Sequence, residues 1–518
     1  MVEKRSGNMA ETVPNRFNLV DEKWIPIANE GLASLKDIFS NAHYTALGGN
    51  PIQKIALTKL LLAIAQAACT PMDDDEWKRI GAKGIAEKAL GYLTDKKECF
   101  WLYGERPFLQ MPEIAKAAKQ SFGAISAGIA TGNTTVLLQS QSEQNLTDAE
   151  KALLIVELGN FALGGKKTDN TIVLSPGYAG KTNDKGKPGT GKPGPAEGFL
   201  GFLHTFLVGS TIKESLWLNT FTKEQINAFA NYAHGIGTAP WERMPKGENC
   251  ERAEELKTTY MGRLVPVSRF TLLMDDGLHY SEGISYPGYA QGGFDASIGV
   301  DFSAIKPRAL WVNPERRPWR QLTSLLAFFS IDRRNTYDCL QLRIGLPRAR
   351  QVLPSIGIWS GGLKVSNNAG EQFASGTDDF VESEFSFKSA WLGKDWFLRL
   401  KTEMAVIEDL SKTVYGCTRG YFKQQKAEGN DQAAQAGSLF WQLAEHHFQD
   451  LINACGIDEG MAMRPLFTHA ANKAYNTYCP RDTARQLDAW AACRSQLGKY
   501  IHPKSNDSSS TNSQEKGE

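Results

Sequence analysis

The sequence predicts an α+β protein in which a mixed α/β N-terminal domain precedes an all-α C-terminal four-helix bundle. Three features predict this arrangement: a long apolar helical stretch near the N-terminus, short β-rich runs in the middle of the chain, and successive helical stripes after about residue 380. The chain has 518 residues, of which 42% are hydrophobic and 22% charged. These values are ordinary for a soluble globular protein of several domains.

The mixed α/β domain is placed at residues 17–379. Residues 1–16 are polar and lack an apolar core, so we expect them to be disordered. The run FNLVDEKWIPI at 17–27 predicts a strand followed by a turn.

Apolar residues cover most of the circumference of a helix predicted at 52–69, which therefore should be buried. Asp73 or Asp74 is placed to cap the helix that follows. Further apolar helices are predicted at 147–163 and 199–208.

The middle of the chain is β-rich and rich in arginine. The run 269–280 predicts two strands joined by a turn at Asp275–Gly277. The stretch 308–350 holds nine arginines. They either form a phosphate-facing surface or are solvated and paired structurally.

The helical stripes define a C-terminal bundle at residues 380–502. One stripe runs through Leu400, Met404, Ile407, Leu410 and Val414, and two further stripes follow it. The tail at 503–518 is rich in Ser, Asn, Lys and Glu, so we expect it to be disordered.

The most informative segment is the glycine-rich stretch at 174–201. Its eight glycines allow a close backbone approach to a ligand, and its lysines supply charge for phosphates. It therefore predicts a polyanion-binding loop, with a solvated linker as the alternative. The lysines concerned are Lys181, Lys185, Lys187 and Lys192.

A second polar loop lies at 359–383. It contains Lys364, and it sets amide side chains between glycines, where they could enter a duplex groove and contact base edges. The alternative is an ordinary Asn/Gly turn. The candidate wedge residues are Ser366, Asn367, Asn368 and Gln372.

Several functions are disfavoured by the sequence. The eight cysteines include no C-x-x-C pair, so we expect no metal site and no disulfide framework. The GKPGTGK run places Pro193 where a phosphate loop needs Ser or Thr, and no other cofactor motif is evident. No nucleophile–base arrangement is apparent, which favours a protein that is not an enzyme. Without a signal peptide or a long apolar run, a cytoplasmic protein is expected.

Four segments, in this order, resemble the large subunit (CasA) family of the type I-E CRISPR surveillance complex, Cascade. They are LVDEKWIP, FWLYGERPFLQ at 100–110, SPGYAG at 175–180 and GGLKVSNNAGEQ. The resemblance covers about residues 17–502. It implies a subunit that recognises the protospacer-adjacent motif (PAM) of invading duplex DNA. It also implies help in opening the duplex for the CRISPR RNA, recruitment of the helicase–nuclease, and a role in antiviral defence without catalysis.

The resemblance also implies roles for particular residues. A glycine loop that enters the minor groove corresponds to Gly177, Tyr178, Ala179 and Gly180. The wedge glutamine corresponds to Asn367, Asn368 or Gln372, with Gln372 favoured. A mobile N-terminal loop corresponds to Thr135, Val136 and Leu137. On charge alone, rather than from the resemblance, we expect the four loop lysines and Arg316, Arg317 and Lys364 to contact phosphates. A PAM-contacting lysine of some members has no counterpart near Gly292 and Gly293.

Two other classes of function remain open from the sequence. One is a structural scaffold of a ribonucleoprotein complex that binds proteins alone. The other is a nucleic-acid-processing enzyme whose active site is dispersed along the chain. The partners expected on the favoured interpretation are duplex DNA with a PAM, the crRNA-bearing Cascade subunits and the helicase–nuclease, with no membrane.

Overall fold

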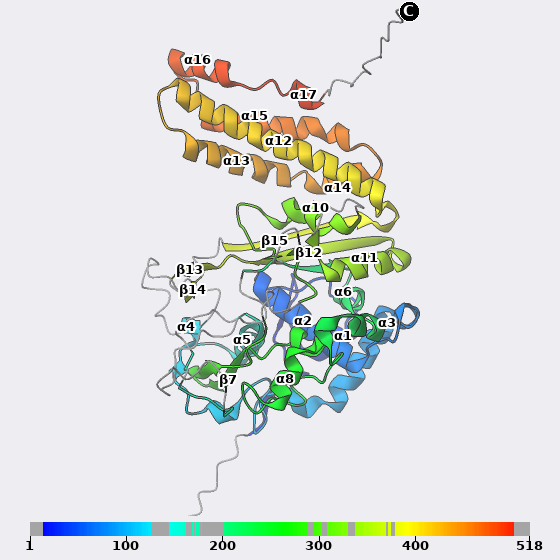
Figure 1. The fold of residues 1–518 in the computed structure, drawn as a ribbon. Helices are drawn as coiled ribbons and strands as arrows, with labels where there is room; N and C mark the ends of the chain where they lie inside the picture. Colours follow the sequence, from blue (N-terminus) through cyan, green and yellow to red (C-terminus); the bar gives the residue numbers. More distant parts are fainter. Residues whose placement is uncertain are drawn as a thin grey trace, which may run out of the picture. The chain divides into compact units, whose positions relative to one another are not determined.

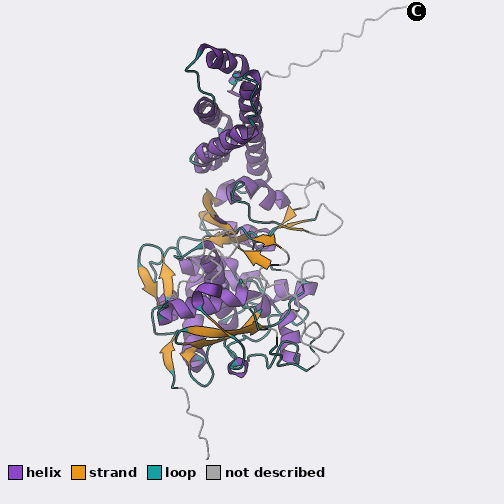
Figure 2. Ribbon diagram, turned by 90° about the vertical axis from the view of Figure 1, so that its left-hand side faces the viewer, coloured by secondary structure: helices purple, strands orange, loops and turns teal. Residues whose placement is uncertain are grey.

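The structure is a computed structural model. It describes residues 14–125, 145–161, 168–169, 171–176, 178, 201–287, 295–302, 308–329, 337–368, 371–373 and 379–501, of which 366–368 and 371–373 are described by their backbone alone. The chain forms two compact units, Met1–Ala390 and Trp391–Glu518. The first unit mixes helices and strands, and the described part of the second is helical (Figures 1 and 2).

The described helices and strands of the first unit follow one another from Arg16 onward. The strands are β1 (Arg16–Asn18), β2 (Ile25–Ile27), β3 (Gly31–Ala33), β4 (Trp101–Tyr103), β5 (Lys119–Gln120), β6 (His204–Val208), β7 (Arg269–Met274), β8 (Gly277–Glu282), β9 (Val300–Asp301), β10 (Arg308–Ala309), β11 (Tyr337–Asp338), β12 (Ser355–Leu363), β13 (Ser366–Asn368), β14 (Glu371–Phe373) and β15 (Phe380–Lys388). The α-helices are α1 (Leu35–Ser40), α2 (Pro51–Ala68), α3 (Asp74–Asp95), α4 (Phe122–Ile125), α5 (Asp148–Asn160), α6 (Ile212–Asn219), α7 (Lys223–Ala228), α8 (Glu251–Lys257), α9 (Tyr260–Leu264), α10 (Leu322–Leu325) and α11 (Leu340–Val352).

The helix predicted at 52–69 is α2, and it is the central helix of the first unit. It begins with a capping box in which Asn50 and Gln53 exchange side-chain and backbone hydrogen bonds. Residues on almost every side of it are buried, because α3, α5, α6 and β12 all pack against it. Asp73 caps α3 by accepting a hydrogen bond from the Glu76 backbone N–H.

The sheet with strand order β15-β12-β6 lies against α2, and in Figure 1 α10 lies on the opposite side of β12 and β15. All its pairings are antiparallel, with Gly361 opposite Glu382 on one side and opposite His204 on the other. The strands β7 and β8 form the hairpin predicted at 269–280, turning between Met274 and Gly277. In the β15-β12-β6 sheet, β6 begins shortly after the glycine-rich stretch ends at Gly201, and the second candidate loop connects β12 to β15.

The helix predicted at 199–208 is wrong, because His204–Val208 form the strand β6. The strand is buried on both faces, and its second edge bonds to the 295–298 segment through Thr205 N–H and the Ser297 carbonyl. A strand buried on both faces reads as a continuous apolar run rather than an alternating one, and this pattern cannot be told from a short buried helix.

Two boundaries also differ from the expected ones. Arg16, placed in the disordered N-terminal segment, lies in β1 and pairs with Asp148 at 2.9 Å. Residues 380–388, placed in the helical domain, form β15 in the sheet of the first unit. Buried and exposed residues alternate along much of β15, but the strand directly follows a polar loop, so the sequence does not mark where the strand begins.

The second unit consists of packed helices in its described part. They are α12 (Lys394–Gln424), α13 (Asn430–Glu445), α14 (Phe448–Gly456), α15 (Arg464–Tyr478), α16 (Ala484–Cys493) and α17 (Gly498–Ile501). The predicted stripe along α12 is buried throughout, and it faces α13, α14, α15 and α16. A buried ion pair joins Arg464 of α15 to Glu403 of α12, with Nε and Oε2 2.7 Å apart.

A chain of buried polar groups ties α2 to β6. Nζ of Lys59 lies 2.7 Å from Oδ2 of Asp295. The other carboxylate oxygen accepts hydrogen bonds from the Ser297 backbone N–H at 2.9 Å and hydroxyl at 2.7 Å, and Nδ1 of His204 lies 2.8 Å from that hydroxyl. Burial lowers the pKa of His204 to about 4. Burial alone would raise the pKa of Asp295, but Lys59 and His204 hold it well below its usual range.

Glu157 on α5 is a buried carboxyl group that is hydrogen-bonded to Gln53. Burial raises the pKa of Glu157 to about 7, and a hydrogen bond from Gln53 opposes this shift. Its Oε1 atom has no hydrogen-bond partner among the described residues. The ionised form is therefore poorly accommodated in the folded state.

We expect Glu157→Gln to become more stable than the wild type as the pH rises. The folded-state pKa lies above the unfolded one, so the favourable contribution of Glu157 is complete below about pH 4 and is lost as the pH rises through 7. The difference in free energy of unfolding should grow between pH 5 and 8 and reach about 3 kcal/mol. Urea denaturation at pH 5, 6, 7 and 8 measures it, and a difference that does not change with pH would contradict the assignment.

Candidate nucleic-acid interface

The root of the glycine-rich segment is held by a buried carboxylate. Glu248 is fully buried, and its oxygens accept hydrogen bonds from the backbone N–H groups of Leu174, at 3.2 and 3.3 Å, and Ser175, at 2.9 Å. The Ser175 hydroxyl accepts a further hydrogen bond from the Asn249 N–H at 3.0 Å. A Cβ at Gly247 would lie 2.2 Å from that hydroxyl, so only glycine permits this contact. The chain therefore enters the glycine-rich segment from a fixed position.

Tyr178 is the described member of the predicted glycine loop. Its N–H donates to the Ser175 carbonyl at 3.2 Å, which makes a turn. Burial raises the pKa of Tyr178 to about 12, with Glu282 and Glu248 adding to the shift and Ser285 and Arg269 opposing it. The phenol is thus half-buried among polar groups of the β7–β8 region, and it helps to anchor the loop.

The remaining residues of that loop lie outside the described residues, so their DNA-binding role stays a prediction. They are Gly177, Ala179 and Gly180. The same holds for Lys181, Lys185, Lys187 and Lys192, and for Thr135, Val136 and Leu137.

The candidate wedge falls on a β-hairpin formed by β13 and β14. The register pairs Ser366 with Phe373, Asn367 with Gln372 and Asn368 with Glu371. Two of the three candidates for the wedge glutamine therefore lie at one level of the hairpin, on opposite strands. Figure 1 shows the hairpin at one end of the strands β12 and β15.

The paired glycines before the hairpin are required by packing. A Cβ at Gly362 would lie 2.7 Å from the Val312 side chain and 2.8 Å from the Phe202 carbonyl oxygen. A Cβ at Gly361 would lie 2.8 Å from the Trp359 ring. The strand β12 therefore passes close to the segment that follows Gly201, and no larger residue fits without displacing one of them.

Three candidate segments converge at this point. The N–H of Val312 donates to the Gly201 carbonyl at 2.7 Å, and the N–H of Leu203 donates to the Leu310 carbonyl at 2.9 Å. Beneath them Leu203, Val312 and Val381 form one small core cluster. The end of the glycine-rich segment, the start of the arginine-rich stretch and the root of the hairpin thus share one packed junction.

The described arginines of the arginine-rich stretch include some that serve the structure and some that are exposed near the junction. Arg343 pairs with Asp338 at 3.0 Å. Arg348 is buried with its guanidinium 4.5 Å from the centre of a Trp77 ring, and burial lowers its pKa to about 10. These two arginines therefore serve the structure, as the alternative interpretation expected.

The second group of cations is exposed near the junction. Arg316 and Arg317 follow a turn in which the Arg316 N–H donates to the Asn313 carbonyl at 2.9 Å. Lys364 stands at the end of β12, where its N–H donates to the Asp379 carbonyl at 2.8 Å. The exposed cations are Arg308, Arg316, Arg317 and Lys364. Such an arrangement can bind phosphate groups without reading sequence.

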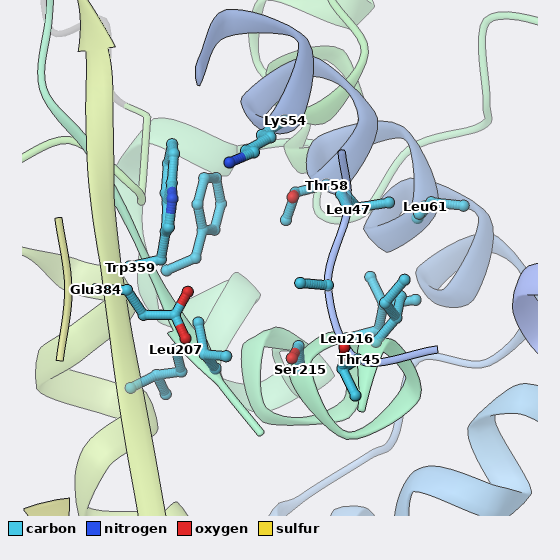
Figure 3. A pocket seen from close by; sticks show the side chains of 14 residues that line it. Thr45, Leu47, Lys54, Thr58, Leu61, Leu207, Ser215, Leu216, Trp359 and Glu384 are labelled. Carbon is cyan, nitrogen blue, oxygen red and sulfur yellow. The ribbon is translucent and has the colours of Figure 1, made fainter. Parts of the chain in front are cut away.

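The first unit also contains a cavity of about 90 Å³, bounded by α2, α6 and the β15-β12-β6 sheet (Figure 3). Its lining is mainly apolar, and Figure 3 shows Trp359 on the side facing Lys54. Lys54 pairs with Glu382 at 2.7 Å, and burial raises the pKa of Glu384. The hydroxyl of Ser215 donates to the Thr211 carbonyl at 2.9 Å.

The cavity lining contains few ionisable groups. Among its described residues Glu384 is the single acid, and histidine and cysteine do not occur. In the described ranges of the chain, no group of three His, Cys, Asp or Glu residues is placed to hold a metal ion. No described helix is both long and apolar enough to cross a membrane.

The fold is shared with solved structures of CRISPR-associated proteins. Thermobifida fusca Cse1 superimposes with a TM-score of 0.72 and 18% identity, covering 94% of this chain and 98% of that one. Thermus thermophilus CasA superimposes with a TM-score of 0.67 and 17% identity, covering 94% of this chain and 99% of that one. A chain of a CRISPR RNA-guided surveillance complex superimposes with a TM-score of 0.66 and 17% identity, covering 94% of this chain and 100% of that one. The fold is therefore one found in CRISPR-associated proteins.

The sequence itself matches the model of the family "CRISPR-associated protein Cse1" over residues 18–487. The chain belongs to this Cse1 family. A curated relative, CRISPR-associated protein CasA/Cse1 of Thermus thermophilus, is 30% identical over 166 residues. That alignment spans 29% of this chain and 32% of the relative. The resemblance stated from the sequence is confirmed at the level of the family.

Proposed function

We propose that this chain is the non-catalytic large subunit of a type I-E Cascade complex, and that it recognises the PAM of invading double-stranded DNA. Membership of the Cse1 family supports the assignment. The DNA-binding part of this proposal rests on the packed junction. The end of the glycine-rich segment, exposed arginines and the root of the hairpin meet there. A single approaching duplex can reach all three.

The glycine loop, Gly177–Gly180, enters the minor groove in this proposal. The minor groove presents a degenerate pattern that mainly separates A·T from G·C, so several PAM sequences should be accepted. Backbone N–H groups can reach base acceptors there, where a Cβ would collide. The buried Glu248 supports this assignment by fixing Leu174 and Ser175 before the loop, and the half-buried Tyr178 is itself held among polar groups. The loop lysines and the exposed arginines contact phosphates.

The β13–β14 hairpin acts as the wedge that separates the strands next to the PAM. Opening a duplex costs about 1.4 kcal/mol for each stacked step, and pairing with the guide RNA offsets this cost only after opening has begun. A polar hairpin tip that takes the place of the first base pair lowers the free-energy cost of opening the first step of the duplex. The first unit, which extends to Ala390 and includes β15, would then be the PAM-recognition domain.

The helical unit supplies docking surfaces for partners. We assign the helices between Lys394 and Ile501 to a four-helix bundle that contacts the crRNA-bearing subunits and recruits the helicase–nuclease. The chain would act in antiviral defence in the cytoplasm, without a cofactor of its own.

A randomised PAM library tests the proposed function. The complex reconstituted with this chain should enrich a limited set of sequences beside the target, and the same complex without the chain should enrich none. Enrichment that is equal in both preparations, or absent from both, would show that the chain is a scaffold rather than the PAM reader. Neutralising the four loop lysines should then leave DNA binding unchanged.

We expect the double variant Asn368→Ala, Gln372→Ala to slow strand separation more than initial binding. The loss of the polar side chains that replace one base pair should slow opening about 10-fold, the factor that corresponds to one stacked step. Permanganate footprinting of unpaired thymines measures the rate of opening, and gel shift at short times measures initial binding.

Pre-opened DNA provides the control for this prediction. A target with a mismatched bubble beside the PAM does not need to be opened, so the variant should bind it as fast as the wild type. An equal defect on duplex and bubble DNA would mean that these residues contribute contacts rather than wedge the strands apart.

A further inference from the structure

Trp311 is a large aromatic residue that stays 44% exposed at the packed junction. Its ring is held from beneath by the Phe202 ring, in an edge-to-face contact with 4.9 Å between centroids. A Cβ at Gly201 would lie 2.8 Å from the six-membered ring, so glycine at this position allows the backbone to contact the indole. Gly201 also has a φ of +115°, which favours glycine for a second reason. The indole is therefore fixed by packing while much of it faces solvent.

The position of Trp311 relates it to both candidate loops. Gly201 is the last residue of the glycine-rich segment, and a Cβ built there would lie 3.6 Å from Cβ of Val365. Val365 directly precedes the β13–β14 hairpin. The indole thus lies between the end of the segment proposed to hold the duplex and the root of the hairpin proposed to open it.

Exposed cations outnumber exposed acids in the sequence around Trp311. Arg308, Arg316 and Arg317 are exposed, and Glu315 is the exposed acid among them. Lys364, also exposed, adjoins Val365. An exposed aromatic ring among cations is the combination that binds single-stranded nucleic acid, since the ring stacks on a base and the cations hold the backbone. A protein-docking surface would instead be expected to surround the ring with apolar residues.

We propose that Trp311 stacks on an unpaired base at the fork where the duplex opens, and so holds the separated strands apart. This inference rests on the proposed function, because it needs the hairpin to open DNA beside the junction. Stacking on an aromatic side chain does not depend on the identity of the base. Trp311 would therefore stabilise the opened state for every target sequence and leave PAM preference unchanged.

Two substitutions separate stacking from packing. Trp311→Phe keeps an aromatic face over Gly201, whereas Trp311→Leu keeps an apolar side chain without one. In the assembled complex we expect Trp311→Leu to weaken binding to bubble DNA about 10-fold and Trp311→Phe to stay within about 3-fold of the wild type. Met274→Ala, at an exposed apolar residue on the β7–β8 turn, is the control and should change nothing.

The fluorescence of 2-aminopurine reports the stack directly. The probe is placed in turn at the first two unpaired positions of each strand of the bubble. With the wild type, one position should be quenched on binding; the quenching should persist in Trp311→Phe and disappear in Trp311→Leu. Equal quenching in all three proteins at every position would overturn the inference.

The outcomes also distinguish this inference from the proposed function. If the wild-type complex selects PAM sequences but neither variant alters quenching or affinity, then the stacking role alone is wrong. If the wild type selects no PAM, then the proposed function itself fails. If Trp311→Leu instead prevents incorporation into the complex, seen by gel filtration, then the ring docks a protein partner and the stacking role is rejected.

Discussion

Replacing Gly177 or Gly180 with valine is expected to abolish PAM-dependent DNA binding while the complex still assembles. A Cβ and its branched methyl groups cannot enter a narrow minor groove where backbone alone is expected to fit. The loss should remove the specific part of the affinity, on the order of 10³-fold, and leave the salt-dependent phosphate contacts. A gel shift with PAM-containing and PAM-free DNA measures it, and gel filtration checks assembly.

A matched control lies in the same segment. Gly189→Val changes a glycine that is also in the glycine-rich stretch but outside the Gly177–Gly180 loop, so it should leave PAM-dependent binding within about 3-fold of the wild type. If both kinds of variant weaken binding equally, then the whole stretch acts as a flexible linker. Unchanged affinity for PAM DNA in Gly177→Val and Gly180→Val would remove the loop assignment.

Much of the fold could be predicted because its strongest patterns are local. The helix α2 is buried on nearly all sides, and the β7–β8 hairpin has a Gly277 turn; both patterns appear in a short window of sequence. The strand β6 could not be predicted, since its burial on both faces depends on partners distant in sequence. Its apolar run alone fits a helix equally well.

The candidate site was predictable only in part, for a similar reason. The glycine-rich segment and the polar hairpin stand out by composition, but the register that places Asn367 opposite Gln372 is set by pairing that composition does not encode. Glu248, which holds the loop root, has no local signal, because its partners Leu174 and Ser175 are distant in sequence. Trp311 is an aromatic residue in an arginine-rich stretch, and this combination is visible in the sequence. A count of charges alone does not bring it out, because the ring is uncharged.

The arginines show why residue type does not settle a role. Arg348 and Arg316 lie in one arginine-rich stretch, yet one is buried against Trp77 and the other is exposed. The difference arises because Arg348 lies on the buried side of α11, while Arg316 follows a surface turn. Helical periodicity across 340–352 was the available signal, since it separates Arg348 from the exposed Arg343.

Lys59→Met should destabilise the first unit severely, by about 3–5 kcal/mol in free energy of unfolding. The substitution removes the ammonium group and leaves the Asp295 carboxylate buried, with the Ser297 hydrogen bonds as its remaining support. A buried charge without a counter-ion costs far more than the pair contributes when complete. Urea denaturation of the purified chain at pH 7, followed by tryptophan fluorescence, measures the loss.

The same helix provides a control of matched chemistry. Lys54 also pairs with a carboxylate at 2.7 Å, that of Glu382, but both partners are partly exposed. Lys54→Met should therefore cost at most about 1 kcal/mol. The double variant Lys59→Met, Asp295→Leu removes both buried charges and should recover part of the stability lost in Lys59→Met. Equal losses for Lys54→Met and Lys59→Met would mean that solvent reaches the Asp295 carboxylate. The polar chain from α2 to β6 would then not hold the sheet behind the packed junction in place.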